Sequence, residues 1–127
     1  YSIQAAIAAI HAESSSPDTT DWHEIVGLYE VLLRVNANPV IALNRAVAVG
    51  MRDGAAAGAR AVDEIYDSGA LADYHLLHAA RADFQRQLGL YQAALTAYET
   101  ALGYAQQLPE IRFLEKRIAE MRAKLAS

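Results

Sequence analysis

The sequence predicts an all-α domain, built as an array of three antiparallel helix pairs followed by a C-terminal capping helix. Three observations predict this fold class. Alanine supplies 27 of the 127 residues, a bias that favours closely packed helices over strands. The segments Trp22–Leu33 and Tyr91–Leu102 align aromatic on aromatic, glutamate on glutamate and leucine on leucine, about two periods of 34 residues apart. Apolar residues also recur at helical spacing along most of the chain.

The first helix pair is predicted over residues about 2–36. Its first helix carries an apolar stripe at helical spacing, formed by Ile3, Ile7 and Ile10. The Ser14–Thr20 segment is rich in serine and threonine and contains a proline, so it is predicted to be a loop. Asp21, followed by Glu24, resembles a capping box and indicates where the second helix begins.

The second and third pairs are predicted over residues about 39–68 and 72–107. Asn38 before Pro39 is typical of a helix cap followed by a first turn. Gly54 and Gly89 stand where a helix would end in a left-handed residue, and their spacing gives the same repeat period.

A seventh helix is predicted over residues about 109–125. Its apolar residues fall on one face, and the remainder is mostly charged. They are Ile111, Leu114, Ile118, Met121 and Leu125. Such a seam suits either a coiled coil or the cap of a helical array. The seam extends over only two heptads, so we favour the capping helix, which needs one buried face and one solvent-exposed face.

Composition excludes several classes of protein. The formal net charge of −4 argues against direct nucleic-acid binding by this chain, which would need a basic face. The absence of cysteine excludes disulfides and thiolate metal sites. No apolar run is long enough for a membrane helix, and no signal peptide opens the chain, so we expect a cytoplasmic location without membrane contact. The chain begins with Tyr1, which suggests a single domain cut from a longer protein.

The repeat period and helix-pair pattern resemble those of tetratricopeptide repeats. The third pair carries the family's small and aromatic positions most completely: Ala82, Gly89, Tyr91, Ala94, Tyr98 and Ala101. The alanines let neighbouring helices approach closely, and the tyrosines fill the gap between successive pairs. The other two pairs depart from the pattern, with Ile25 and Leu32 at small positions of the first, and Asp63 and Tyr66 at an aromatic and a small position of the second.

A closer resemblance covers nearly the whole chain. It rests on the stretches Gln4–Glu13, Thr20–Leu33, Asn38–Val49, Tyr74–Gly89 and Ile111–Met121. These stretches resemble the C-terminal, tetratricopeptide-like extension of a group of bacterial extracytoplasmic-function sigma factors. The resemblance implies that the rest of the protein binds core RNA polymerase and promoter DNA, outside this chain. The partners it implies here are the protein's own N-terminal sigma domains, core RNA polymerase, or both.

A polar pair interrupts the apolar segment Val40–Met51. Asn44 and Arg45 map to the first helix of the second pair, whose exposed side would line the concave groove of the array. Arginine can pair with a carboxylate and asparagine with a peptide backbone, so a peptide or protein ligand could bind there. The alternative is structural, with Asn44 holding a helix end and Arg45 pairing with an internal acid. The same groove could continue through His78, Arg81 and Gln85, and through Gln4 in the first pair.

No catalytic signature is present, and we expect no enzyme activity, no cofactor and no metal. His75 and His78 could share one helix face, but a metal site would need a third ligand such as Asp83 or His11. The predicted function is therefore a non-catalytic regulatory and protein-interaction domain that supports transcription initiation. The alternative is a helical domain that binds a small molecule or a metal and has enzymatic activity.

Overall fold

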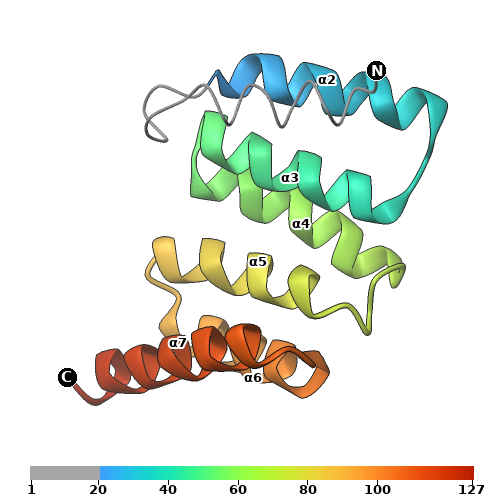
Figure 1. Cartoon of the computed structure of the whole chain (residues 1–127). Helices are drawn as coiled ribbons and strands as arrows, with labels where there is room; N and C mark the ends of the chain where they lie inside the picture. Colours follow the sequence, from blue (N-terminus) through green and yellow to red (C-terminus); the bar gives the residue numbers. More distant parts are fainter. Residues whose placement is uncertain (1–20) are drawn as a thin grey trace.

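The computed structural model describes residues 21–127, and over that range the fold is all-α, as predicted (Figure 1). Six helices follow one another without an intervening strand in the described part of the chain. They are α2 (Trp22–Val35), α3 (Pro39–Asp53), α4 (Ala55–Ser68), α5 (His75–Gln87), α6 (Tyr91–Tyr104) and α7 (Leu108–Ala126). The helix predicted near the N-terminus, with its isoleucine stripe, lies outside the described residues, as does Gln4.

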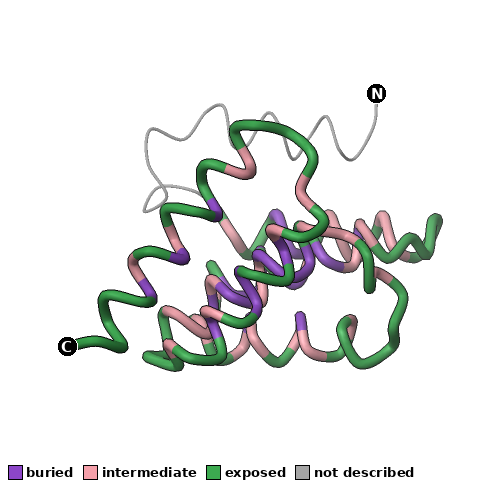
Figure 2. The backbone as a smooth tube through the Cα atoms, turned by 90° about the horizontal axis from the view of Figure 1, so that it is seen from below, coloured by how far each residue is buried: buried purple, intermediate pink, exposed green. Residues whose placement is uncertain are grey.

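Each described helix packs against the next one along the chain, and α3 also contacts α5. This is the arrangement expected of a helical repeat array, in which each unit contacts only its neighbours. Figure 2 shows buried residues along the sides of the helices that face one another, with exposed residues on the outer sides. None of the described helices is long and apolar enough to cross a membrane.

Local sequence signals place several helix ends. The carboxylate of Asp21 accepts a hydrogen bond from the backbone N–H of Glu24 at 3.1 Å. The Asn38 side chain accepts one from the N–H of Val40 at 2.8 Å, with Pro39 in the first turn of α3. Both side chains satisfy N–H groups that have no partner inside the helix. Gly54 and Gly89 have positive φ angles of 104° and 79°, which only glycine adopts without strain.

The core between the third pair and the cap is built from small residues around one large one. Ala94, Tyr98 and Ala101 of α6 are fully buried, as the repeat pattern indicates for these positions. They pack against the α7 seam, whose buried members are Leu114, Ile118 and Met121. Leu125, at the end of that seam, is exposed.

A second packing element joins α3, α4 and α5 through two glycines. A Cβ atom built on Gly50 or Gly58 would lie 2.3 Å or 2.5 Å from the buried ring of Phe84. A Cβ on Gly58 would also lie 2.8 Å from the Cα of Gly50. The absence of side chains at both positions therefore lets α3 and α4 cross closely while Phe84 of α5 packs against the crossing.

Candidate functional site

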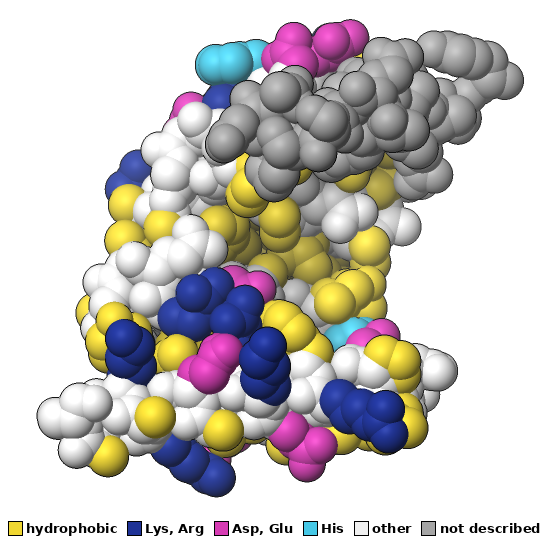
Figure 3. Space-filling model, turned by 60° about the vertical axis from the view of Figure 1, so that its left-hand side comes forward, with side chains coloured by type: hydrophobic (Ala, Val, Ile, Leu, Met, Phe, Trp, Pro, Cys, Tyr) yellow, Lys and Arg dark blue, Asp and Glu magenta, His cyan; other side chains and the backbone are white. Residues whose placement is uncertain are grey.

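Helices α3, α5 and α7 together line a groove, which we call the α3–α5–α7 groove. It holds a cavity of about 440 Å³. Figure 3 shows the hollow, with hydrophobic side chains along its floor. Its lining residues are Leu43, Asn44 and Val47 of α3, His75, Leu76, Ala79, Ala80 and Asp83 of α5, and Pro109, Glu110, Phe113 and Leu114 of α7.

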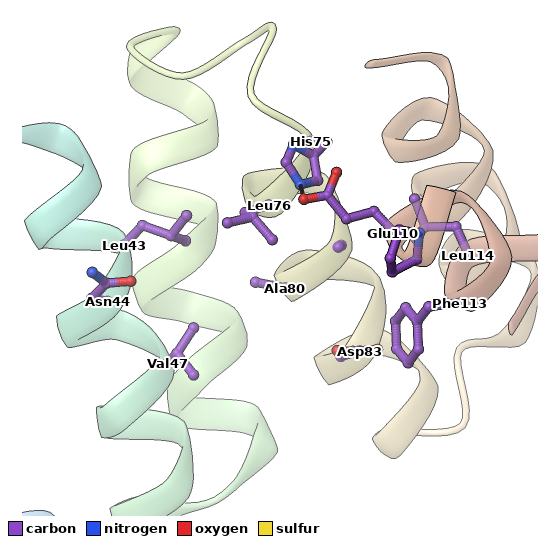
Figure 4. A pocket seen from close by; sticks show the side chains of 12 residues that line it. Leu43, Asn44, Val47, His75, Leu76, Ala80, Asp83, Glu110, Phe113 and Leu114 are labelled. Atoms are coloured by element: carbon purple, nitrogen blue, oxygen red, sulfur yellow. Dashed lines mark ion pairs between the residues drawn. The ribbon is translucent and has the colours of Figure 1, made fainter. Parts of the chain in front are cut away.

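Apolar side chains from all three helices remain accessible in this groove. Val47, Leu76 and Phe113 are 36%, 46% and 43% exposed, while Leu43 and Leu114 are buried beneath them. Figure 4 shows Val47 and Leu76 on facing walls, with Phe113 on the α7 side. Exposed large apolar residues that come together in one depression are typical of ligand or partner surfaces.

The polar groups of the groove are few, and most are acceptors. Asn44 is exposed on the α3 wall, and Asp83 is half-buried on α5. At one end, His75 Nε2 lies 3.1 Å from Glu110 Oε1, an ion pair when the imidazole is protonated (Figure 4). This contact links α5 to the first turn of α7.

A second depression, of about 360 Å³, shares His75 and Glu110 with the groove. We call it the polar end. Its other lining residues are Asp73, Tyr74, Tyr104, Gln106 and Gln107. The hydroxyl of Tyr104 hydrogen-bonds to Asp73, and this bond raises the pKa of Tyr104. The rings of Tyr74 and His75 meet edge to face, with centroids 5.6 Å apart.

A hydrogen-bonded network connects Asp83 to the core between α5 and α6. The buried Tyr98 hydroxyl donates to the Asp83 carboxylate and accepts from Arg86 Nε at 3.2 Å. Burial, together with the hydrogen bond to Asp83, raises the pKa of Tyr98 to about 12. The network holds a carboxylate at the groove while satisfying the buried hydroxyl.

Replacing Tyr98 with phenylalanine should lower the free energy of unfolding by about 1–3 kcal/mol, because Asp83 and Arg86 lose their shared partner. It should also change the pH dependence. With a folded pKa near 12 and an unfolded value of 10.0, Tyr98 stabilises the fold fully below pH 10, and that contribution is lost as pH rises toward 12. Urea titrations from pH 8 to pH 12 check this. Equal losses of stability between pH 8 and pH 12 in the parent chain and the Tyr98→Phe variant would contradict this expectation.

The sequence-predicted residues are distributed over several surfaces. Asn44 lines the α3–α5–α7 groove and also a smaller depression of about 170 Å³ beside Trp22 and Tyr29. Arg45 Nη2 lies 3.2 Å from Glu30 Oε1 on α2, and Arg45 is not among the lining residues. The structural alternative for Arg45 was a pair with an internal acid, whereas the Glu30 side chain is 44% exposed.

The three candidates on α5 face away from the groove wall. His78 is buried, with Nε2 at 2.7 Å from the carbonyl oxygen of Ala72, and its ring stacks on Tyr104. Arg81 donates to Asp63 at 3.0 Å and covers the ring of Tyr66. Gln85 is half-buried, and its Oε1 has no hydrogen-bond partner among the described residues. The residues of α5 that do line the groove precede these candidates by one to three positions. Because each residue turns the helix by about 100°, a shift of one position moves a side chain to a different face.

Among residues 21–127, no group of three or more histidine and carboxylate side chains could hold a metal ion. His75 and His78 are three residues apart on α5, but their ring nitrogens contact different partners, Glu110 and the Ala72 carbonyl.

Replacing Arg45 with alanine should cost less than about 1 kcal/mol of stability, because both members of the Glu30 pair are partly exposed and screened by solvent. Thermal unfolding of the variant should therefore stay within a few degrees of the parent chain. The Glu30→Gln variant removes the same ion pair from the other side and serves as the control. A large loss of stability would contradict this and would mean that the Arg45–Glu30 pair has a structural role.

Comparison with known proteins identifies one long match. The whole chain is 38% identical over 127 residues to an uncharacterized protein of Rhizobium meliloti (strain 1021). The chain spans about 30% of the length of that relative. No protein-family model matches the chain, and no solved structure is significantly similar to it.

Proposed function

We propose that this chain is a non-catalytic interaction and regulatory module of a bacterial extracytoplasmic-function sigma factor. It supports transcription initiation in the cytoplasm through contacts with its own sigma domains, with core RNA polymerase, or with both. In this proposal, the α3–α5–α7 groove is the surface that binds the partner protein or domain.

The apolar lining of the groove is the observation that carries the interaction role. Three separate helices present accessible apolar side chains, Val47, Leu76 and Phe113, around a cavity with few polar groups. Helical arrays commonly use such extended concave surfaces to bind other proteins. The sigma-factor role is supported by the resemblance of five stretches of the sequence. It also fits a relative whose length extends well beyond the matched region.

The charge distribution supports protein contacts over DNA contacts. Two arginines of α7, where basic residues are densest, are paired with carboxylates. Arg117 lies 3.0 Å from Glu120, and Arg122 lies 3.3 Å from Glu99. Phosphate binding needs several accessible cations on one face, and carboxylates among them would repel the phosphates.

In vitro transcription by core polymerase tests this function, with the full-length protein compared to a version lacking residues 1–127. We expect the truncated protein to lose sigma-dependent transcription or its regulation. The isolated chain should not bind promoter DNA at physiological salt. Unchanged transcription after truncation would contradict the proposal, and so would salt-sensitive, promoter-selective binding by the isolated chain.

A further inference from the structure

Acidic side chains line one side of the α3–α5–α7 groove and its polar end. The carboxylates of Asp73, Asp83 and Glu110 line the two depressions. No lysine or arginine is among the described residues that line either of them. Two arginines lie close by: Arg86 donates to Tyr98 beside Asp83, and Arg117 pairs with Glu120 while its guanidinium lies 5.2 Å from the centre of the Phe113 ring. The case for a cationic ligand therefore rests on the polar end, where Asp73 and Glu110 have no lysine or arginine among the described lining residues.

The polar end has the groups that bind a cation. The Glu110 side chain is 35% exposed, and its Oε1 lies 3.1 Å from His75 Nε2, so the rest of the carboxylate remains accessible to a ligand. Asp73 lies in the same depression with the aromatic rings of Tyr74 and Tyr104. Carboxylates form strong hydrogen bonds with guanidinium and ammonium groups, and tyrosine faces attract the same cations.

The size of the groove indicates how a partner would use it. A cavity of about 440 Å³ has room for a few side chains, whereas an α-helix with its side chains is about 10–12 Å across. A helix would therefore lie along the opening and insert apolar residues between Val47, Leu76 and Phe113. Helix-in-groove recognition uses such anchors, one turn apart.

We propose that the α3–α5–α7 groove binds an amphipathic helix of a partner protein, which inserts apolar side chains into the groove and places an arginine or lysine in the polar end beside Glu110 and Asp73. This inference rests on the proposed function, because it identifies the chemistry of the partner for the same surface. The ligand proposed here is positively charged, whereas binding through Arg45 would favour a negatively charged ligand. Arg45 faces Glu30 and is absent from the groove lining.

The N-terminal segment of the chain does not have this chemistry. Residues 1–20 contain three isoleucines at helical spacing but no lysine or arginine. Residues 1–20 therefore do not supply the basic residue, which the proposal places on the helix of a partner protein.

Peptide binding to the 127-residue chain tests the proposal without polymerase. The probe is a fluorescent synthetic helical peptide with two leucines one turn apart and an arginine at the end of the same face. The control peptide carries glutamate in place of the arginine. We expect the arginine peptide to bind at least about fivefold more tightly than the glutamate peptide, a difference of about 1 kcal/mol.

Two charge-neutralising variants on α7 localise the effect. Glu110→Gln removes the carboxylate at the polar end, and Glu115→Gln removes one from an exposed position of the same helix outside the groove lining. Glu110→Gln should reduce the preference for the arginine peptide, and Glu115→Gln should leave it unchanged.

Three outcomes would overturn the inference: equal binding of the two peptides, binding of neither, or self-association of the chain that Glu110→Gln abolishes. The last would make a second copy the occupant. If peptide binding fails while deletion of the chain still abolishes transcription, the inference falls and the proposed function stands.

Discussion

Replacing Ala94 with arginine is expected to destabilise the domain by about 3–5 kcal/mol, because the substitution forces a charge into a filled contact between helices. Ala94 is fully buried on α6, in the cluster that includes Tyr98 and Leu114.

Ala93→Arg is the matched control, because the neighbouring residue on the same helix is exposed. Its stability should stay within about 0.5 kcal/mol of the parent chain. Chemical denaturation of the three proteins measures the difference. Equal stability of the Ala94 and Ala93 variants would show that the repeat register placed on α6 is incorrect.

Replacing Gly58 with alanine is expected to destabilise the domain by about 1–3 kcal/mol, although alanine is the better helix former. The new methyl group would lie 2.5 Å from the Phe84 ring and 2.8 Å from the Gly50 Cα atom. Because the crossing helix contributes backbone to this contact, α3 and α4 would have to separate.

The control for this substitution is Gly27→Ala on α2, where a Cβ atom meets nothing within 4 Å. That variant should gain about 0.5–1 kcal/mol from helix propensity alone. Opposite signs for the two glycine substitutions in thermal and urea unfolding are the expected result. A stabilised Gly58 variant would contradict the close crossing of α3 and α4.

Features encoded over a few residues could be predicted from the sequence. The caps at Asp21 and Asn38 depend on side chains two or three residues from the N–H groups they satisfy. The burial of Ala94 follows from a repeat that places small residues at helix contacts, and the apolar seam of α7 follows from helical spacing.

Features that depend on how helices cross could not be predicted in the same way. Phe84 reaches two glycines on other helices, and nothing in the local sequence around Gly50 or Gly58 indicates this contact. The pairing of His75 with Glu110 also joins helices that are separated by α6. His78, Arg81 and Gln85 were predicted to line the groove from their positions on α5. That prediction required the rotation of α5 about its axis to be known to within one residue, and hydrophobic periodicity does not give the rotation so accurately.

The proposed function makes the α3–α5–α7 groove the surface through which this chain would act in transcription. A matched pair of leucine substitutions tests it most directly, because Leu76 in the groove and Leu125 at the end of α7 are 46% and 44% exposed. In the full-length protein, Leu76→Gln should reduce sigma-dependent transcription about fivefold through loss of apolar contact. Leu125→Gln should leave transcription unchanged, and both variants should melt near the parent temperature. Equal transcription from the two variants would contradict the claim.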